Sequence, residues 1–327
     1  MPRKRSVLLL PALLVLGAWA QSRTRLPLNP FQSNSRASSA APDADSSEVN
    51  VKVNTNLVQI PVTVTDKTDH PVVALNRENF QIYENGVAET IAYFETGESP
   101  ISTCLLFDSS MSMADKIHRS LEAMSEFLDA AVAGDEYCLI RFSNWPEKMV
   151  GITEGTRQVA DAIRRIHPAG FTALLDAIYA GTQEVRQGHN RRKAILLISD
   201  GGDNRSEHTI KEIKQLVREA DAQIYSIGIL SPEDQVFSQE EADGPALMKT
   251  ISHDSGGRLF RIHEISELPS AVAKVTMALR HQYLLGYYPK DVRNDGKYRH
   301  VAVKLTLPRG VSHVHAYWRA GYYSPSE

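Results

Sequence analysis

The chain has 327 residues, of which 42% are hydrophobic, 23% charged and 7% aromatic. This length exceeds one ordinary domain, so we expect two domains or one domain with a large addition. The composition is typical of a globular chain that can bury a core, which excludes wholesale disorder. A formal net charge of -3 provides no general attraction to phosphate backbones, which argues against a nucleic-acid-binding protein.

The N-terminus has the layout of a secretory signal peptide. Basic residues at 3–5 precede an apolar stretch at 7–16, and a small-x-small triplet follows at 18–20. A retained membrane anchor is the alternative, but a span needs about 20 apolar residues, more than this stretch offers. We therefore predict a signal peptide over residues 1–20, cleavage after Ala20, and an exported chain, periplasmic or secreted, with no transmembrane segment after cleavage.

Two further parts precede the main domain. Residues 21–50 are rich in Ser, Ala, Pro and Asn without helical or strand periodicity, which predicts a disordered tether. Residues 51–99 alternate apolar and polar side chains in short runs separated by turn residues, which predicts an all-β unit. Its strands are expected at 58–64, 71–75, 79–83 and 89–94.

Residues 100–280 alternate apolar runs with amphipathic helices, the pattern of an α/β domain with a doubly wound, mostly parallel sheet covered on both faces. Strands are expected at 102–107, 136–142, 148–152, 194–199, 222–229 and 258–261. Helices are expected at 114–132, 156–166, 173–186, 210–220, 245–254 and 264–279.

The last part of the chain, residues 281–324, returns to strands, expected at 283–288, 300–307 and 312–318. Few-stranded sheets with unpaired edges are poorly stable alone. We therefore expect both ends to pair into one small β-sandwich, with the α/β domain inserted between its strands.

Two cysteines cannot make a disulfide framework or a zinc-ribbon set, and no His pair has HExxH spacing, which argues against structural zinc. Cys104 and Cys138 each lie in an apolar, strand-like run. Export makes a bond between them chemically feasible. Buried free thiols are the favoured interpretation, since free cysteine packs like a small hydrophobe.

Polar side chains follow the first and fourth strands of the α/β domain. Asp108, Ser110 and Ser112 follow the first strand, Asp200 follows the fourth, and Thr172 lies in a loop just before a helix. In a doubly wound sheet these two strands flank the switch point where ligands bind. The five oxygen ligands suit Mg²⁺ or Mn²⁺, with waters completing an octahedron. The alternative is that the serines cap the next helix and Asp108 is a turn residue.

With these residues the chain resembles the von Willebrand factor type A domains and their metal-ion-dependent adhesion site. The segments FQIYENG, IAYFE, GFTALLDAIY, ILLISDGGDN, YLLGYYP and AGYY extend the resemblance over residues 56–323 to the exported A-domain proteins of Acidobacteria. The resemblance implies that Asp108, Ser110, Ser112, Thr172 and Asp200 hold the metal. Similar loops commonly read Asp-x-Ser-Gly-Ser, and Met111 replaces that glycine, which would strain the site if the position needs a left-handed backbone.

The expected function is a non-enzymatic adhesion or protein-binding module. Only two carboxylates take part, so the bound ion keeps net positive charge and can capture an Asp or Glu of a protein partner. A metal-assisted hydrolase, a scaffold with a vestigial metal site and a glycan-binding surface remain alternatives. Asp203 is expected to be a solvated turn carboxylate, and the basic run at 191–193 a solvated approach to a strand.

Overall fold

The computed structural model of the chain describes residues 57–230 and 239–326, so the predicted signal peptide and tether lie outside the described residues. Within the described part, no helix is both long and apolar enough to cross a bilayer. The described residues belong to one unit, Val53–Glu327.

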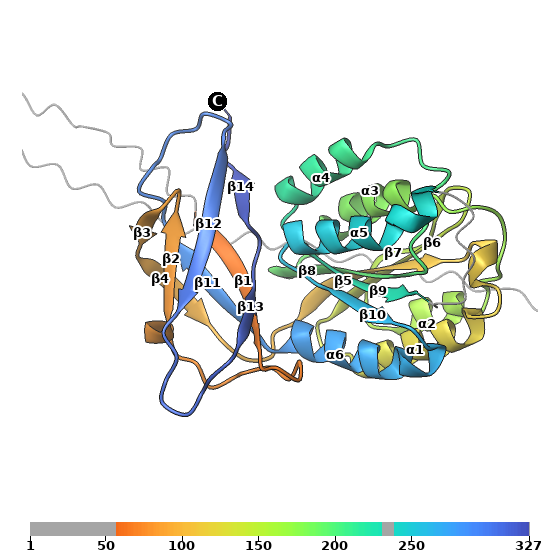
Figure 1. Cartoon of the computed structure of the whole chain (residues 1–327), viewed down its shortest axis with the longest axis horizontal. Helices are drawn as coiled ribbons and strands as arrows, with labels where there is room; N and C mark the ends of the chain where they lie inside the picture. The colour runs from red at the N-terminus through yellow and green to blue at the C-terminus, as the bar shows by residue number, and fades with distance from the viewer. Residues whose placement is uncertain (1–56, 231–238, 327) are drawn as a thin grey trace, which may run out of the picture. The chain divides into compact units, whose positions relative to one another are not determined.

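A six-stranded sheet with the order β10-β9-β8-β5-β6-β7 forms the centre of the α/β part, as predicted (Figure 1). Neighbouring strands are parallel except that β7 runs antiparallel to β6. β5 and β8 are neighbours although two strands and three α-helices separate them in sequence, so the switch point lies between them. The strands are β5 (Ile101–Asp108), β6 (Glu136–Phe142), β7 (Pro146–Glu154), β8 (Arg192–Ser199), β9 (Gln223–Ile229) and β10 (Leu259–Ile262).

Helices cover both faces of this sheet, and β5, β6, β8 and β9 are therefore buried on both sides. One apolar cluster includes side chains of α1, α2 and α6, and a second includes side chains of α3, α4 and α5 (Figure 1). The helices are α1 (Ile117–Asp129), α2 (Arg157–Ile163), α3 (Leu174–Val185), α4 (Ile210–Glu219), α5 (Gln239–Asp254) and α6 (Leu268–Arg280).

Two four-stranded antiparallel sheets use strands from before and after the α/β part, in the orders β13-β1-β11-β4 and β14-β12-β2-β3. β1 pairs with β11 and β2 pairs with β12. Side chains of both sheets, among them Ile60, Ile82 and Leu285, belong to one buried cluster. The strands are β1 (Val58–Thr65), β2 (Phe80–Glu84), β3 (Val87–Glu89), β4 (Ile91–Glu95), β11 (Gln282–Tyr287), β12 (Tyr298–Leu305), β13 (His315–Tyr317) and β14 (Gly321–Tyr323).

The strand predicted at 71–75 is wrong. Only Pro71 makes a bridge, to Thr65. The Tyr283 hydroxyl accepts from the Leu75 amide at 3.1 Å and donates to the Val72 carbonyl at 2.6 Å. The buried Tyr283 side chain therefore supplies hydrogen-bond partners that a neighbouring strand would otherwise provide. In addition, β3 and β14 are strands that the sequence did not predict.

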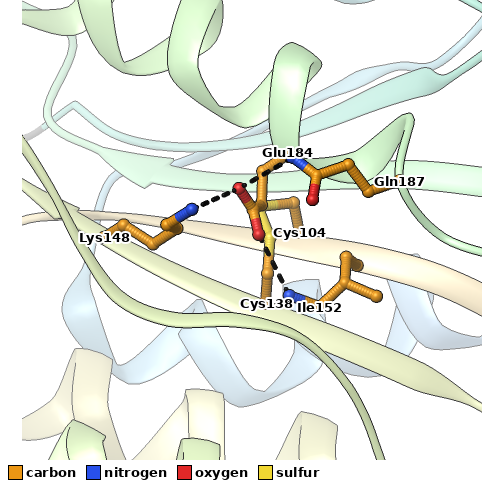
Figure 2. The surroundings of a disulfide bond; sticks show 6 residues. All are labelled: Cys104, Cys138, Lys148, Ile152, Glu184 and Gln187. Atoms are coloured by element: carbon orange, nitrogen blue, oxygen red, sulfur yellow. Dashed lines mark hydrogen bonds and ion pairs between the residues drawn. A yellow bond between two sulfur atoms is a disulfide. The ribbon is translucent and has the colours of Figure 1, made fainter.

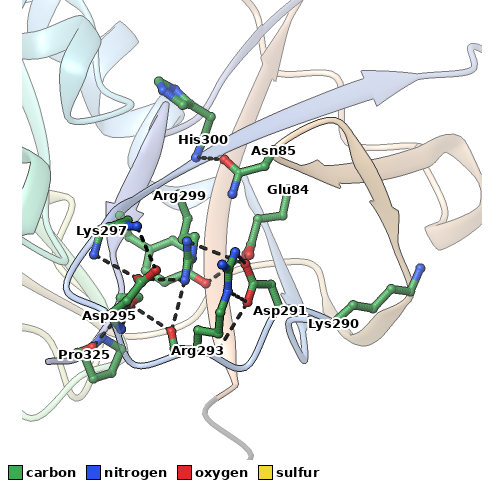
Figure 3. A network of polar contacts seen from close by, with 12 residues as sticks. Glu84, Asn85, Lys290, Asp291, Arg293, Asp295, Lys297, Arg299, His300 and Pro325 are labelled. Atoms are coloured by element: carbon green, nitrogen blue, oxygen red, sulfur yellow. Dashed lines mark hydrogen bonds and ion pairs between the residues drawn. The ribbon is translucent and has the colours of Figure 1, made fainter. Parts of the chain in front are cut away.

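A buried carboxylate on β2 connects the two antiparallel sheets. Glu84 is 3% exposed and accepts from the hydroxyls of Tyr287 and Tyr322, both at 2.8 Å. Burial, together with the Glu84 carboxylate, raises the pKa of Tyr287, so the phenol stays a donor. Figure 3 shows the charged cluster nearby, where Arg299 lies 2.8 Å from Asp295.

A buried ion pair lies where the chain enters and leaves the α/β part. Asp135 accepts from the Arg280 guanidinium at 3.0 Å, from the Ile101 amide at 3.0 Å and from the Val132 amide at 2.9 Å. The Asp135 side chain is 1% exposed. Ile101 begins β5 and Arg280 ends α6. The Asp135 carboxylate therefore contacts both the first and the last element of the α/β part.

The expected solvated basic run at 191–193 is wrong for its central residue. Arg192 is 2% exposed and donates to the carbonyls of Gly97 at 2.9 Å and Gln282 at 3.4 Å. It also pairs with Glu95 at 3.5 Å. Burial lowers the pKa of Arg192, and the charge of Glu95 opposes that effect.

Cys104 and Cys138 form a disulfide, so the favoured free thiols were wrong. The two residues are register partners on the neighbouring strands β5 and β6, with their Cα atoms 4.5 Å apart, inside the range that a disulfide needs. Register between strands cannot be deduced from the apolar runs alone. Figure 2 shows the neighbouring Glu184, which accepts from Lys148 at 2.9 Å and from the Ile152 amide at 3.1 Å.

Candidate metal and protein-binding site

Three loops meet at the carboxyl edge of the parallel sheet. Because β5 and β8 are neighbours, Asp108 at the end of β5 and Asp200 just after β8 come together. The Met111 amide donates to the Gly170 carbonyl at 3.0 Å, and the Asn204 amide donates to the Thr172 carbonyl at 3.0 Å. These backbone bonds tie the loops after β5 and β8 to the loop before α3.

Asp108 is a fully buried carboxylate, 0% exposed. One oxygen accepts from the Ser110 amide at 2.9 Å, and the other accepts from the Ser199 hydroxyl at 2.6 Å. Burial and the nearby charge of Asp200 raise the pKa of Asp108 to about 7. The charged form of Asp108 is therefore disfavoured by its surroundings, and a nearby cation would stabilise it.

Two hydroxyls lie next to each other beyond this carboxylate. The Oγ atoms of Ser110 and Ser112 are 3.0 Å apart, and Ser110 is 1% exposed. Adjacent ligands of an octahedral Mg²⁺, each about 2.1 Å from the ion, are about 3 Å apart. The observed spacing therefore fits two neighbouring positions of one magnesium shell.

Lys116 is a site residue that the sequence analysis missed. Its ammonium lies 3.3 Å from Oδ2 of Asp200, and the two side chains are 13% and 9% exposed. The available signal was its position four residues after Ser112, just before α1 begins. A built-in cation thus already balances one of the two carboxylates.

Thr172 is 4% exposed, and its amide donates to the Asn204 side chain at 2.9 Å, which places it beside the Asp200 loop. Asp203 is not the solvated turn carboxylate that was expected. It accepts from the Leu174 amide at 3.2 Å at the start of α3, and burial raises its pKa. In the described part of the chain, no three His, Cys, Asp or Glu side chains gather as a metal site.

The expected strain at Met111 is absent. Met111 begins a short 3₁₀ turn, Met111–Met113, and among the described non-glycine residues only Asp69, Asn85 and His313 have positive φ. The loop therefore accepts a side chain at this position without a left-handed backbone. The Met111 side chain is 58% exposed.

A doubly wound sheet with carboxylate and hydroxyl side chains at its switch point is the architecture of a class of binding domain. Residues 103–202 match the family described as von Willebrand factor type A domain. The chain therefore contains a von Willebrand factor type A domain, a class that commonly mediates protein–protein interaction.

Two curated proteins share this part of the chain. Inter-alpha-trypsin inhibitor heavy chain H2 of Sus scrofa is 30% identical over 195 residues, covering 54% of this chain and 20% of that protein. Heavy chain H4 of Homo sapiens is 28% identical over 181 residues, covering 51% of this chain and 19% of that protein. The chain thus spans about a fifth of the length of these relatives.

A solved structure, von Willebrand factor type A from Catenulispora acidiphila, covers 84% of this chain and 74% of its own. It is 11% identical, with a TM-score of 0.48.

Proposed function

We propose that the switch-point edge binds Mg²⁺ or Mn²⁺ through Asp108, Ser110, Ser112, Thr172 and Asp200, and that the bound ion captures a carboxylate of a protein partner. The observation that carries this proposal is the serine pair, with its oxygens 3.0 Å apart, beside a buried Asp108 of raised pKa. When bound, the ion supplies a Lewis-acidic position for an outside oxygen. Both Asp108 oxygens already accept hydrogen bonds, which suits contact through water.

The charge balance favours an acidic partner. With both carboxylates ionised, Asp108 and Asp200 contribute two negative charges and Lys116 one positive charge, so these three groups sum to -1. A divalent ion changes the net charge to about +1. A partner's Asp or Glu is then attracted, and the proposed role is binding without turnover.

We further propose that the protein is exported, to the periplasm or the outside, and that the two four-stranded sheets form a sandwich carrying the A domain. The Cys104–Cys138 bond supports export, because disulfides persist mainly in oxidising compartments. The predicted signal peptide at 1–20 leads to the same proposal.

Calorimetric titration of the chain without residues 1–20 tests the metal site. We expect saturable Mg²⁺ and Mn²⁺ binding by the wild type and a loss of at least about 100-fold in affinity for Asp200→Ala, because half of the negative charge is removed. Asp161→Ala, which removes an exposed partner of Arg164, is the matched control. Equal binding by Asp200→Ala and wild type would mean that the metal lies elsewhere.

Lys116→Met is expected to move two affinities in opposite directions. Loss of the ammonium beside Asp200 removes repulsion of the metal, so Mg²⁺ should bind about tenfold more tightly. The loaded site then loses its net positive charge, so a Glu-containing peptide should bind more weakly. Lys148→Met, which removes the exposed partner of Glu184, is the control, and a parallel change in both affinities contradicts the charge balance.

A further inference from the structure

Three large apolar side chains are exposed at the same edge of the sheet as the candidate metal site. Met111 is 58% exposed, Trp145 is 66% exposed and Phe171 is 63% exposed. Met111 follows β5, Trp145 lies in the turn between β6 and β7, and Phe171 lies in the loop before α3. The carboxyl ends of parallel strands meet at one edge, so the three loops are neighbours. We call these three residues the apolar rim.

Hydrogen bonds between the loops hold the rim in place. The Phe171 amide donates to the Asn144 side chain at 2.8 Å, directly beside Trp145 in sequence. The Met111 amide donates to Gly170, which directly precedes Phe171. Gly170 has a φ of +76°, and a Cβ atom there would lie 2.7 Å from the Asn144 side chain. The rim is therefore built on interlocked loops.

Exposed apolar side chains of this size cost solvation free energy unless a partner covers them. Trp, Phe and Met are also the residue types enriched in the buried centres of protein interfaces. The rim borders a site whose proposed metal-loaded charge is about +1. Apolar area around a positive centre is complementary to a carboxylate that has apolar neighbours.

We propose that the apolar rim selects, among acidic protein segments, those in which the Asp or Glu is flanked by apolar side chains. This inference rests on the proposed metal-dependent capture of a carboxylate, and it adds the residues that decide which carboxylate is captured. Met111 extends the rim beside the metal ligands, while Trp145 and Phe171 supply the aromatic contact.

The test uses two displayed peptide libraries, with three random residues on each side of a central Glu or a central Gln, selected on the protein in Mg²⁺. The targets are wild type, Trp145→Ser/Phe171→Ser, and a control with exposed valines replaced, Val73→Ser/Val292→Ser. Met111 is kept because it lies between two ligand serines. A conservative variant, Trp145→Phe/Phe171→Leu, keeps the rim apolar.

The wild type and the valine control should enrich Glu over Gln peptides with apolar flanks. The serine variant should lose the flank preference, with affinity for the best wild-type peptide falling at least about tenfold, and the conservative variant should restore it. Glu enrichment without flank preference, or an unchanged preference in the serine variant, overturns the rim inference and leaves the proposed function standing. Absence of Glu enrichment overturns both.

A membrane or a second copy of the chain, if either covered the apolar rim instead of a peptide, would give a different result. Rim-dependent sedimentation with phosphatidylcholine–phosphatidylglycerol vesicles, without any flank preference, would make the rim a membrane contact and overturn the inference. A rim-dependent dimer in light scattering, again without flank preference, would make it a contact between copies of the chain.

Discussion

Asp108→Asn is expected to stabilise the metal-free protein at pH 8 by about 4 kcal/mol and to abolish its measurable Mg²⁺ binding. Burial and the charge of Asp200 raise the pKa of Asp108 from 3.8 to about 7, so the ionised carboxylate opposes folding. Asparagine has the shape of the protonated group and no charge. Urea unfolding in chelator measures the stability change, and calorimetry measures the lost metal binding.

The stability difference between wild type and Asp108→Asn should depend on pH. A carboxyl whose pKa is raised by folding contributes its stability fully below 3.8 and loses it as the pH rises to about 7. The difference between wild type and Asp108→Asn should therefore be near zero at pH 4 and reach its full size above pH 7. Mg²⁺ should stabilise the wild type alone. A difference that is constant from pH 4 to pH 8 contradicts an unbalanced carboxylate at this position.

Asp135→Ala is expected to lower the free energy of unfolding by about 4 kcal/mol, because it leaves the Arg280 guanidinium buried without its partner. The amides of Ile101 and Val132 lose their acceptor as well. Urea unfolding at pH 7 measures the loss. The exposed pair of Asp161 with Arg164 is the matched comparison, and Asp161→Ala should cost less than about 0.5 kcal/mol.

The double variant Asp135→Ala/Arg280→Met separates the ion pair from the packing around it. Burial raises the pKa of Asp135, but hydrogen bonds from Arg280 and the backbone outweigh burial, so the pKa is lowered overall. The Asp135 contribution should therefore be complete above about pH 4 and be lost as the pH falls through the lowered pKa of the folded state. If the double variant loses the sum of the two single losses, the two groups do not act as a pair.

The sequence pattern was sufficient to predict the parallel sheet and the position of the loops that form the candidate site. Apolar runs alternating with amphipathic helices predicted the α/β class, and chain order alone placed the loops of Asp108 and Asp200 on neighbouring strands. This inference succeeds because parallel strands leave their carboxyl ends at one edge, whatever the details of packing. The 3₁₀ turn at Met111 was not predicted, since a single side chain carries no signal for its own φ.

Contacts between distant segments required the tertiary structure. The Cys104–Cys138 bond depends on the register of two strands, and the burial of Arg192 depends on carbonyls from two other segments. Asp203 caps a helix that begins before it in the chain, and Lys116 reaches Asp200 across 84 positions.

The sequence by itself determined which residue types follow each strand, and hence the proposed oxygen ligands, because these are local properties of the chain. Only the tertiary structure decided the charge of that site and the apolar rim beside it. Electrostatic balance and exposure arise from groups that folding brings together or leaves uncovered, and Lys116, Trp145 and Phe171 each show this.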